Sequence, residues 1–140
     1  LYYPGLTNEE KRLSNIHPKE AILVFIYMTV AEISAKVHFG RNSTDDESDA
    51  FRHFVWAGLL DKGLGMELAR DFLDAHESSS PMNQPDTAMD IANNGRGLIS
   101  AERLKKNGKL TLKEIQKEAL KLIKEGKLVV LQVKGGSTYE

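Results

Sequence analysis

Hydrophobic residues recur along most of this chain at the three- and four-residue spacing of amphipathic helices. Capping-box patterns at Thr7 and Thr111, together with Pro18, mark three helix starts. The longest apolar run, Ala21–Val30, is too short to span a membrane, and we expect it to form the central core helix. The pattern predicts helices over residues 8–16, 18–38 and 48–62, around His76, from 86 to about 94, over 100–104 and from 112 to about 123.

These elements predict a single all-α domain. We expect residues 1–134 to form a compact orthogonal bundle of six or seven helices with at most one C-terminal β-strand. A motif-bearing body would span residues 6–98, followed by a basic helix and strand over 100–134. Leu128–Val133 has strand character, and we expect it to pair with another chain or with another part of a larger protein. Residues 135–140 are expected to form a flexible tail.

A polar stripe crosses the third predicted helix. Its residues occupy positions i, i+3, i+4 and i+7 and therefore share one helix face: Asp49, Arg52, His53 and Trp56. Apolar side chains cover the other faces, so this helix is expected to be buried together with its ionisable groups. Buried ionisable groups are costly unless they are paired. We therefore expect Asp49 to hold His53, within either a structural ion-pair network or a working site.

Two later helices also place polar residues where core residues are expected. His76 lies on the apolar face of its helix, and Glu77 follows at the helix end. Asp90, Asn93 and Asn94 share one face of the next helix. Asparagine is a poor helix former, so two in succession indicate amides with specific partners. Three helices that present polar groups to one centre would form a pocket.

Composition narrows the chemistry. The 19 Lys and Arg residues nearly balance the 20 Asp and Glu residues, which gives no strong nucleic-acid signal. The basic residues concentrate in 101–140, either as a solvated helix face or as a contact for a phosphate or an anionic surface. The chain has no cysteine, which excludes cysteine nucleophiles, zinc fingers and iron–sulfur clusters. We expect no transmembrane segment.

Three motifs occur in a fixed order: Asp49-Ala50-Phe51-Arg52-His53-x-x-Trp56, Ala75-His76-Glu77 and Met89-Asp90-x-x-Asn93-Asn94. Over residues 6–98 the chain resembles a bacterial domain family of unassigned function, found at the C-termini of wall-associated and Rhs-type polymorphic toxins and in small exported proteins. It departs from the family pattern at Ala92, where histidine is frequent, and at Leu98, where arginine is frequent. If the missing histidine were catalytic, this chain would be inactive or would use another residue.

The resemblance implies a bacterial protein that is secreted, periplasmic or associated with the cell envelope. It also implies two kinds of partner, a cognate immunity protein and a larger carrier protein or delivery system. It names no substrate.

Imidazole and carboxylate groups supply the remaining catalytic chemistry. We expect His53 and His76 to act as general bases, with Asp49 orienting His53 and Glu77 serving as the acid partner. The groups expected to bind substrate are Arg52, Trp56, Asp90, Asn93 and Asn94. The sequence therefore predicts a toxin-like hydrolase that acts on a cell-envelope substrate, peptidoglycan or lipid.

Other interpretations use the same residues. Asp49, His53, His76 and Asp90 could hold zinc or another divalent metal ion. The protein could be a toxin nuclease. It could also be a non-catalytic module that binds a partner through its lysine-rich helix and terminal strand, with the Asp–Arg–His network serving stability alone.

Overall fold

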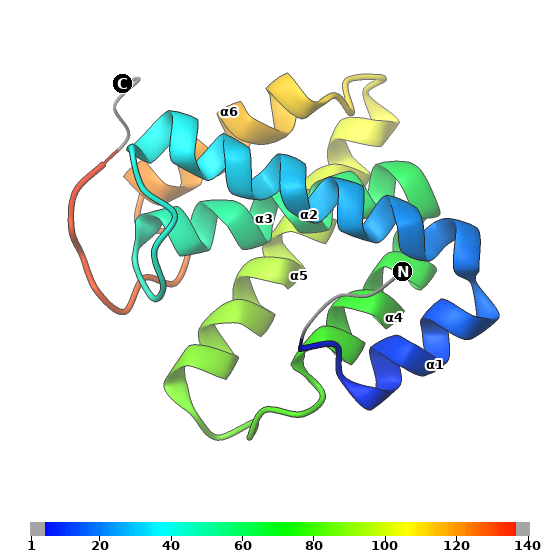
Figure 1. Ribbon diagram of the computed structural model, residues 1–140. Coiled ribbons are helices and arrows are strands. Elements are labelled where there is room, and N and C mark those ends of the chain that lie inside the picture. The colour runs from blue at the N-terminus through cyan, green and yellow to red at the C-terminus, as the bar shows by residue number, and fades with distance from the viewer. Residues whose placement is uncertain (1–4, 137–140) are drawn as a thin grey trace.

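The computed structural model describes residues 5–136 and contains six helices (Figure 1). They are α1 (Asn8–Ile16), α2 (Pro18–Phe39), α3 (Glu47–Leu64), α4 (Met66–Glu77), α5 (Pro85–Lys106) and α6 (Leu112–Lys124). Within residues 5–136 there is no strand, so the predicted all-α helical bundle is confirmed. The predicted starts of α1 and α6 are also confirmed, because Thr7 and Thr111 cap these helices through their side chains.

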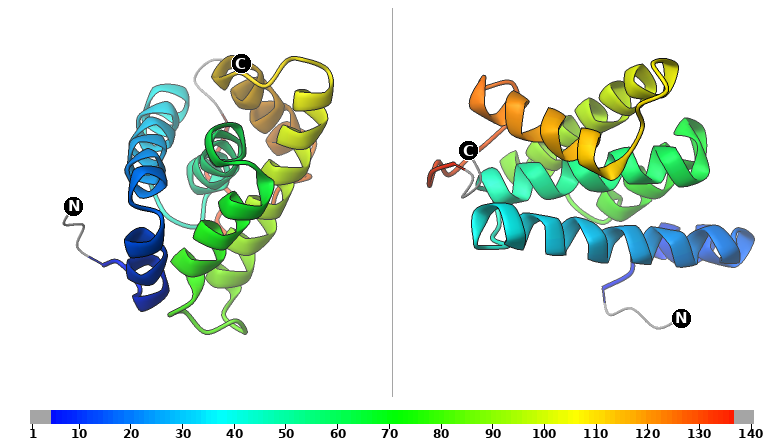
Figure 2. Two further views of the ribbon diagram at one scale, coloured as in Figure 1. Left: turned by 90° about the vertical axis from the view of Figure 1, so that its right-hand side faces the viewer. Right: turned by 90° about the horizontal axis from the view of Figure 1, so that it is seen from above.

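Helix α3 is the centre of the bundle. It packs against α2, α4, α5 and α6, and Figure 2 shows it enclosed by these neighbours. Fourteen of its 18 residues are buried. The prediction that Ala21–Val30 forms the central helix is therefore wrong. Helix α2 runs antiparallel to α3 and leaves four large side chains 50–58% exposed: Ile22, Ile26, Ile33 and Val37.

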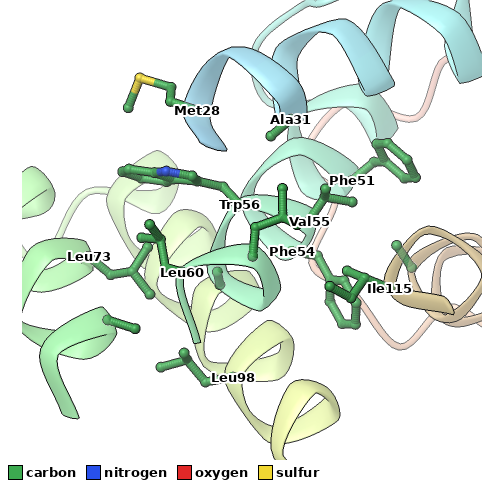
Figure 3. Close-up of a cluster of buried hydrophobic side chains, with 14 of the residues drawn as sticks. Met28, Ala31, Phe51, Phe54, Val55, Trp56, Leu60, Leu73, Leu98 and Ile115 are labelled. Carbon is green, nitrogen blue, oxygen red and sulfur yellow. The ribbon is translucent and has the colours of Figure 1, made fainter. Parts of the chain in front are cut away.

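The core forms around the aromatic residues of α3. Phe51 and Phe54 are fully buried, and Figure 3 shows core side chains of α3 next to those of neighbouring helices. Trp56 is 3% exposed, and its indole Nε1 donates a hydrogen bond of 3.2 Å to the carbonyl oxygen of Val24 in α2. This bond satisfies the polar atom of a buried indole. The packing fixes the direction in which the polar stripe of α3 points.

Helix α5 is continuous, so the predicted break at Gly95–Gly97 and the separate short helix at 100–104 are wrong. Gly97 serves close packing instead. A Cβ at this position would lie 2.6 Å from the carbonyl oxygen of Phe54 and 2.8 Å from the Cβ of Ala57. Glycine therefore lets α5 approach the backbone of α3, and this approach brings the first turns of α5 to the polar stripe.

The segment after α6 does not form the expected strand. Residues 128–136 have no regular secondary structure. Their backbone groups bind side chains of α3 and α5 and the loop between α2 and α3. Asn93 donates from Nδ2 to the carbonyl oxygen of Val129 and accepts from the Val129 amide at Oδ1, each over 2.9 Å. The carboxylate of Glu47 accepts the amides of Lys134 and Gly135. Of the expected tail, residues 137–140 lie outside the described part of the chain.

Helix α2 is long and apolar enough to cross a membrane, judged by length and composition alone. The core helix of a soluble protein passes the same test. In this fold one face of α2 packs against α3.

Candidate functional site

The polar stripe of α3 meets the first turns of α5 at His53, which is 7% exposed. Its Nδ1 lies 3.1 Å from Oδ1 of Asn94. A carbonyl oxygen can only accept, so Nδ1 carries the hydrogen in this contact. The other ring nitrogen, Nε2, lies 3.2 Å from Oδ1 of Asp49 and 3.3 Å from Oδ1 of Asp90. The imidazole is thus fixed on one side and faces two carboxylates on the other.

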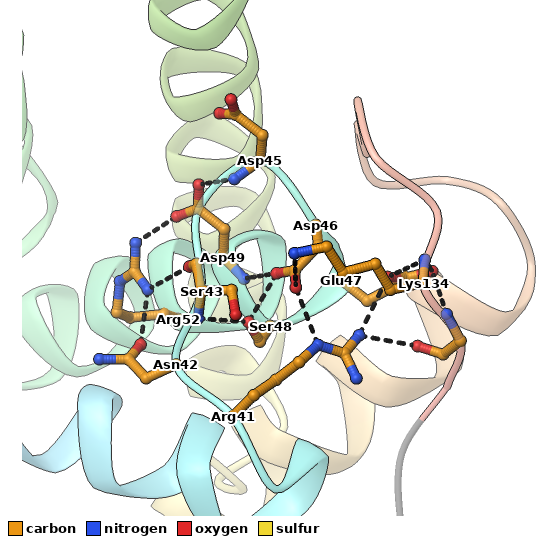
Figure 4. A network of polar contacts seen from close by, with 11 residues as sticks. Arg41, Asn42, Ser43, Asp45, Asp46, Glu47, Ser48, Asp49, Arg52 and Lys134 are labelled. Carbon is orange, nitrogen blue, oxygen red and sulfur yellow. Dashed lines mark hydrogen bonds and ion pairs between the residues drawn. The ribbon is translucent and has the colours of Figure 1, made fainter.

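Asp49 is held by several donors. Arg52, one turn later, donates to its Oδ1, and the backbone amide of Asp45 donates to its Oδ2 over 2.7 Å (Figure 4). Burial alone would raise the pKa of this carboxyl, but hydrogen bonding and charge from His53, together with the charge of Arg52, lower it. Asp49 is therefore an anion at neutral pH. The predicted contact between Asp49 and His53 is confirmed.

Arg52 does not extend freely into the pocket. Its Nη1 donates to Oδ1 of Asn42 over 2.6 Å and to the carbonyl oxygen of Ser43 over 3.1 Å, while Nη2 binds Asp49. The guanidinium therefore ties the loop between α2 and α3 to the site. This arrangement makes Arg52 a positioning group for Asp49, and it leaves less of its charge available to a substrate.

Asp90 has the opposite environment. Its Oδ1 is buried and makes no hydrogen bond, although it faces His53. Burial raises the pKa of Asp90 to about 6, and repulsion from Asp49 and Glu77 adds to this shift, against an opposing effect of His53. A buried carboxylate oxygen without a donor is unusual. A cation at this point would satisfy it.

The geometry of Asp49, His53 and Asp90 fits a divalent metal ion. One ligand atom from each residue lies within 4.8 Å of the other two. Nitrogen and oxygen ligands bound to zinc at roughly 2.0–2.2 Å lie about 3.0–3.4 Å apart in tetrahedral or octahedral coordination. The distances of 3.2 and 3.3 Å from His53 Nε2 agree with this spacing. The bond from His53 Nδ1 to Asn94 is the outer contact that a metal-binding histidine usually makes.

His76 and Glu77 approach the same centre from the end of α4. His76 Nδ1 lies 2.9 Å from Oε2 of Glu10 in α1, and its ring packs edge-on against Trp56. Burial lowers the pKa of His76, but the hydrogen bond and charge of Glu10 outweigh burial and raise it. The pKa of Glu77 is raised mainly by burial. Glu77 therefore keeps its proton at a higher pH than an exposed glutamate does.

A cleft of about 490 Å³ joins these groups. Its lining comes from the residues before α1, from the α2–α3 and α4–α5 loops and from α3, α4 and α5: Gly5, Thr7, Thr44, Asp45, Asp49, Arg52, His53, His76, Glu77, Ser79, Ser80, Asp86 and Asp90. A second cavity of about 310 Å³ shares Thr44, Arg52, His53 and His76 with the cleft and also includes Trp56. The two cavities meet at the two histidines.

Asn93 and Asn94, both expected to bind substrate, lie outside the cleft lining, and their amides bind other protein groups. Asn93 is fully buried and binds Val129, so its role is structural. Three contacts of the site were not predicted: Asn42, Asp45 and Glu10. Asn42 and Asp45 belong to a loop whose shape no periodic pattern encodes. Glu10 could have been noticed as a carboxylate within a capping box.

A larger cavity, of about 570 Å³, lies between α6 and the C-terminal segment. Its lining is mostly apolar and contains no histidine; the charged residues there are Glu47, Lys121 and Lys124. Ionisable groups with displaced pKa values gather instead in the cleft at His53, so that cleft is the candidate site.

The family described as Domain of unknown function (DUF6973) matches residues 11–127. The chain belongs to this family. The DUF6973 match begins at residue 11, five residues after the start of the 6–98 resemblance, and extends past its C-terminal end. It includes all three motifs and α6 and ends immediately before Leu128. No curated protein and no solved structure matches the chain.

Proposed function

We propose that this protein is a metal-dependent hydrolase of the bacterial cell envelope that acts as an antibacterial toxin or effector. The cluster of Asp49, His53 and Asp90 carries the proposal, because it combines suitable ligand spacing with a buried carboxylate oxygen that lacks a donor. A mixed nitrogen and oxygen set suits zinc, and three protein ligands leave a position open for water, as in catalytic zinc sites. When bound, the ion would polarise the scissile group and supply a reactive water at neutral pH.

The remaining cleft residues have roles that match hydrolysis. His76, held by Glu10, can take or return a proton near the reacting atoms. Glu77 can donate a proton to a leaving group, because burial raises its pKa. Arg52 holds the ligand Asp49 in place. This scheme assigns no role to Ala92, where the pattern of the resembled family often has histidine, so the absence of that histidine does not remove a required group.

The charge of the cleft supports an envelope substrate. Five carboxylates line it: Asp45, Asp49, Glu77, Asp86 and Asp90. Arg52 is the one arginine in the lining and is already bound to Asp49. Such a surface would repel the phosphates of a nucleic acid. Peptidoglycan, or a lipid whose headgroup carries no phosphate, therefore suits the cleft better than DNA or RNA, and a nuclease is the alternative that the experiment must exclude.

Three substrates and three variants test the activity. The purified protein, loaded with Zn²⁺ or Mn²⁺, is incubated with peptidoglycan sacculi, phospholipid vesicles or nucleic acid, and the products are identified by mass spectrometry. We expect release of envelope fragments that a chelator stops. His53→Ala and His76→Ala should lower the rate by at least about 100-fold. His17→Ala is the matched control, since His17 lies at the start of α2 and outside the cleft.

Cleavage of nucleic acid alone would contradict the envelope substrate and support the nuclease. Full activity in the folded His53 and His76 variants would contradict a catalytic cleft and favour a non-catalytic module. In bacteria, the protein directed to the periplasm should inhibit growth, whereas the cytoplasmic form should not. The proposal includes a cognate immunity protein and a carrier or delivery system, which would accompany a toxin of this kind.

A further inference from the structure

We propose that Asp45 is a positioning residue for the metal-binding cluster and that the C-terminal segment, residues 128–135, holds it in position. The inference rests on the proposed function, because it assigns to the segment a part in metal binding at Asp49. The segment lies beyond the DUF6973 match, which ends at residue 127 and includes Asp45.

The backbone amide and the backbone carbonyl oxygen of Asp45 both make hydrogen bonds. Its amide donates to Oδ2 of Asp49 over 2.7 Å. Its carbonyl oxygen accepts from the amides of Leu131, over 3.0 Å, and Gln132, over 2.7 Å. One residue thus connects the C-terminal segment to a candidate metal ligand. Figure 4 shows the bond from Asp45 to Asp49 and, on the other side of the loop, the anchoring of Lys134.

The backbone of Asp45 is strained. It is the one non-glycine residue among those described that has a positive φ, at 66°. Such a conformation costs free energy in a residue with a side chain, although less in aspartate than in most residues, and hydrogen bonds from the surroundings can hold it. The two bonds from Leu131 and Gln132 hold it here, together with the bond to Asp49.

The segment is itself fixed on both sides of these two residues. Asn93 binds both backbone groups of Val129, and Glu47 accepts the amides of Lys134 and Gly135. Arg41 completes the second anchor by donating to the carbonyl oxygen of Gly135 over 3.1 Å. These anchors on both sides restrict the backbone positions of Leu131 and Gln132, so their amides are held against the carbonyl oxygen of Asp45.

The consequence concerns the orientation of Asp49. The amide of Asp45 occupies Oδ2, so Oδ1 is the oxygen that faces His53 Nε2. If the segment releases Asp45, the strained residue can relax and withdraw this amide. Asp49 could then rotate away from the metal position. Outer contacts of this kind commonly change metal affinity by roughly 10- to 100-fold.

Proline substitutions in the full chain test the link, because proline removes one amide donor. Gln132→Pro removes a donor to Asp45, Gln132→Ala keeps it, and Lys134→Pro removes a donor to Glu47 in the same segment. Binding of Zn²⁺ and Mn²⁺ is measured by calorimetry. We expect Gln132→Pro to weaken binding by at least about 10-fold and Gln132→Ala to change it by less than about twofold. Lys134→Pro should also change it by less than about twofold, because the Gly135 amide and Arg41 still anchor this end of the segment. Leu131→Pro repeats the test if Gln132→Pro does not fold.

Equal affinity in Gln132→Pro and Gln132→Ala would overturn the inference, as would an equal loss in Lys134→Pro. Hydrogen exchange of the Asp45 amide in the metal-free protein gives a second readout. It should become faster in Gln132→Pro but not in Gln132→Ala, and unchanged exchange would also overturn the link. If the parent protein binds neither metal, the proposed metal centre fails, while the exchange measurement still decides whether the segment holds Asp45.

Discussion

Asn93 and Asn94 are neighbours in α5, yet their amides bind opposite parts of the molecule. Asn94 accepts from the imidazole of His53, at 3.1 Å, whereas Asn93 binds both backbone groups of Val129 at 2.9 Å. One turn of helix therefore supports the candidate metal ligand and also anchors the C-terminal segment.

The two asparagines should respond differently to substitution. Asn94→Ala removes the acceptor that orients His53, and we expect Zn²⁺ affinity to fall by about 10- to 100-fold. Asn93→Ala leaves the backbone groups of Val129 without their partner, and we expect a loss of about 1–3 kcal/mol in the free energy of unfolding. Calorimetric titration and urea denaturation measure the two effects. A larger loss of metal affinity in Asn93→Ala than in Asn94→Ala would contradict this division.

Asp90 should make the metal-free protein less stable as the pH rises. Its pKa in the fold is about 6, above its ordinary value of 3.8, so the folded state holds the proton more tightly than the unfolded state does. Stability is therefore lost between about pH 4 and pH 6 and stays reduced above that range. Asp90→Asn should stabilise the metal-free protein by roughly 1–3 kcal/mol at pH 8 and have little effect at pH 4.

We expect Zn²⁺ to raise the melting temperature of the parent protein at pH 8, because a metal that binds the folded state stabilises it, and we expect Asp90→Asn to abolish this increase. Denaturation at the two pH values, with and without the ion, measures both effects. If Asp90→Asn changed the free energy of unfolding equally at pH 4 and pH 8, the pKa of Asp90 would not be raised in the folded protein.

The pair of His76 and Glu10 gives a second pH dependence. The raised pKa of His76 provides stability below about pH 6.5 that is lost as the pH rises through its folded value. The lowered pKa of Glu10, whose ordinary value is 4.5, provides stability above that value and loses it as the pH falls. His76→Ala should therefore cost most near pH 5.5, roughly 1–3 kcal/mol, and less at pH 9.

Urea denaturation at the two pH values tests this expectation. His17→Ala is the control, because His17 Nδ1 lies 3.9 Å from Oε1 of Glu20 in a half-exposed pair that should contribute less than about 0.5 kcal/mol. A cost of His76→Ala that is the same at pH 5.5 and pH 9 would contradict an ionic contribution from the pair.

Two glycines of α5 should have opposite effects when replaced by alanine. Gly97→Ala would place a methyl group 2.6 Å from the carbonyl oxygen of Phe54, so we expect a loss of at least about 1–3 kcal/mol. Around Gly95 a Cβ would meet nothing within 4 Å, and alanine should stabilise the helix by about 0.5–1 kcal/mol. Thermal denaturation compares the two variants. Similar effects would show that α5 does not need its close approach to α3.

Local patterns predicted the parts of this fold that depend on local interactions. Helix starts followed from caps at Thr7 and Thr111, and the contact between Asp49 and His53 followed from their spacing of four residues. The predicted break of α5 at Gly95–Gly97 was wrong, because a sequence does not distinguish a glycine required for packing from a glycine that ends a helix. The pairing of His76 with Glu10 joins residues 66 positions apart, and no periodicity reports it.

The strand expected at Leu128–Val133 was wrong for a related reason. Alternating apolar residues indicate an extended chain but do not identify its hydrogen-bond partners. Here the partners are the side chain of Asn93 and the carbonyl oxygen of Asp45, neither of which belongs to a sheet. The interpretation of the terminal strand as a partner-binding edge loses support, since these backbone groups already bind the same molecule.

The enclosure of α3 limits how this domain can diversify. Two of the three candidate metal ligands, Asp49 and His53, lie on a helix with hardly any solvent-facing position, so most substitutions there would disturb the core as well as the chemistry. The residues that can vary freely around the cleft are those of its rim, such as Thr44, Ser79 and Asp86. New substrate ranges would therefore evolve through substitutions in the rim loops. The buried residues of α3 at the base of the cleft would change little, because the fold itself requires them.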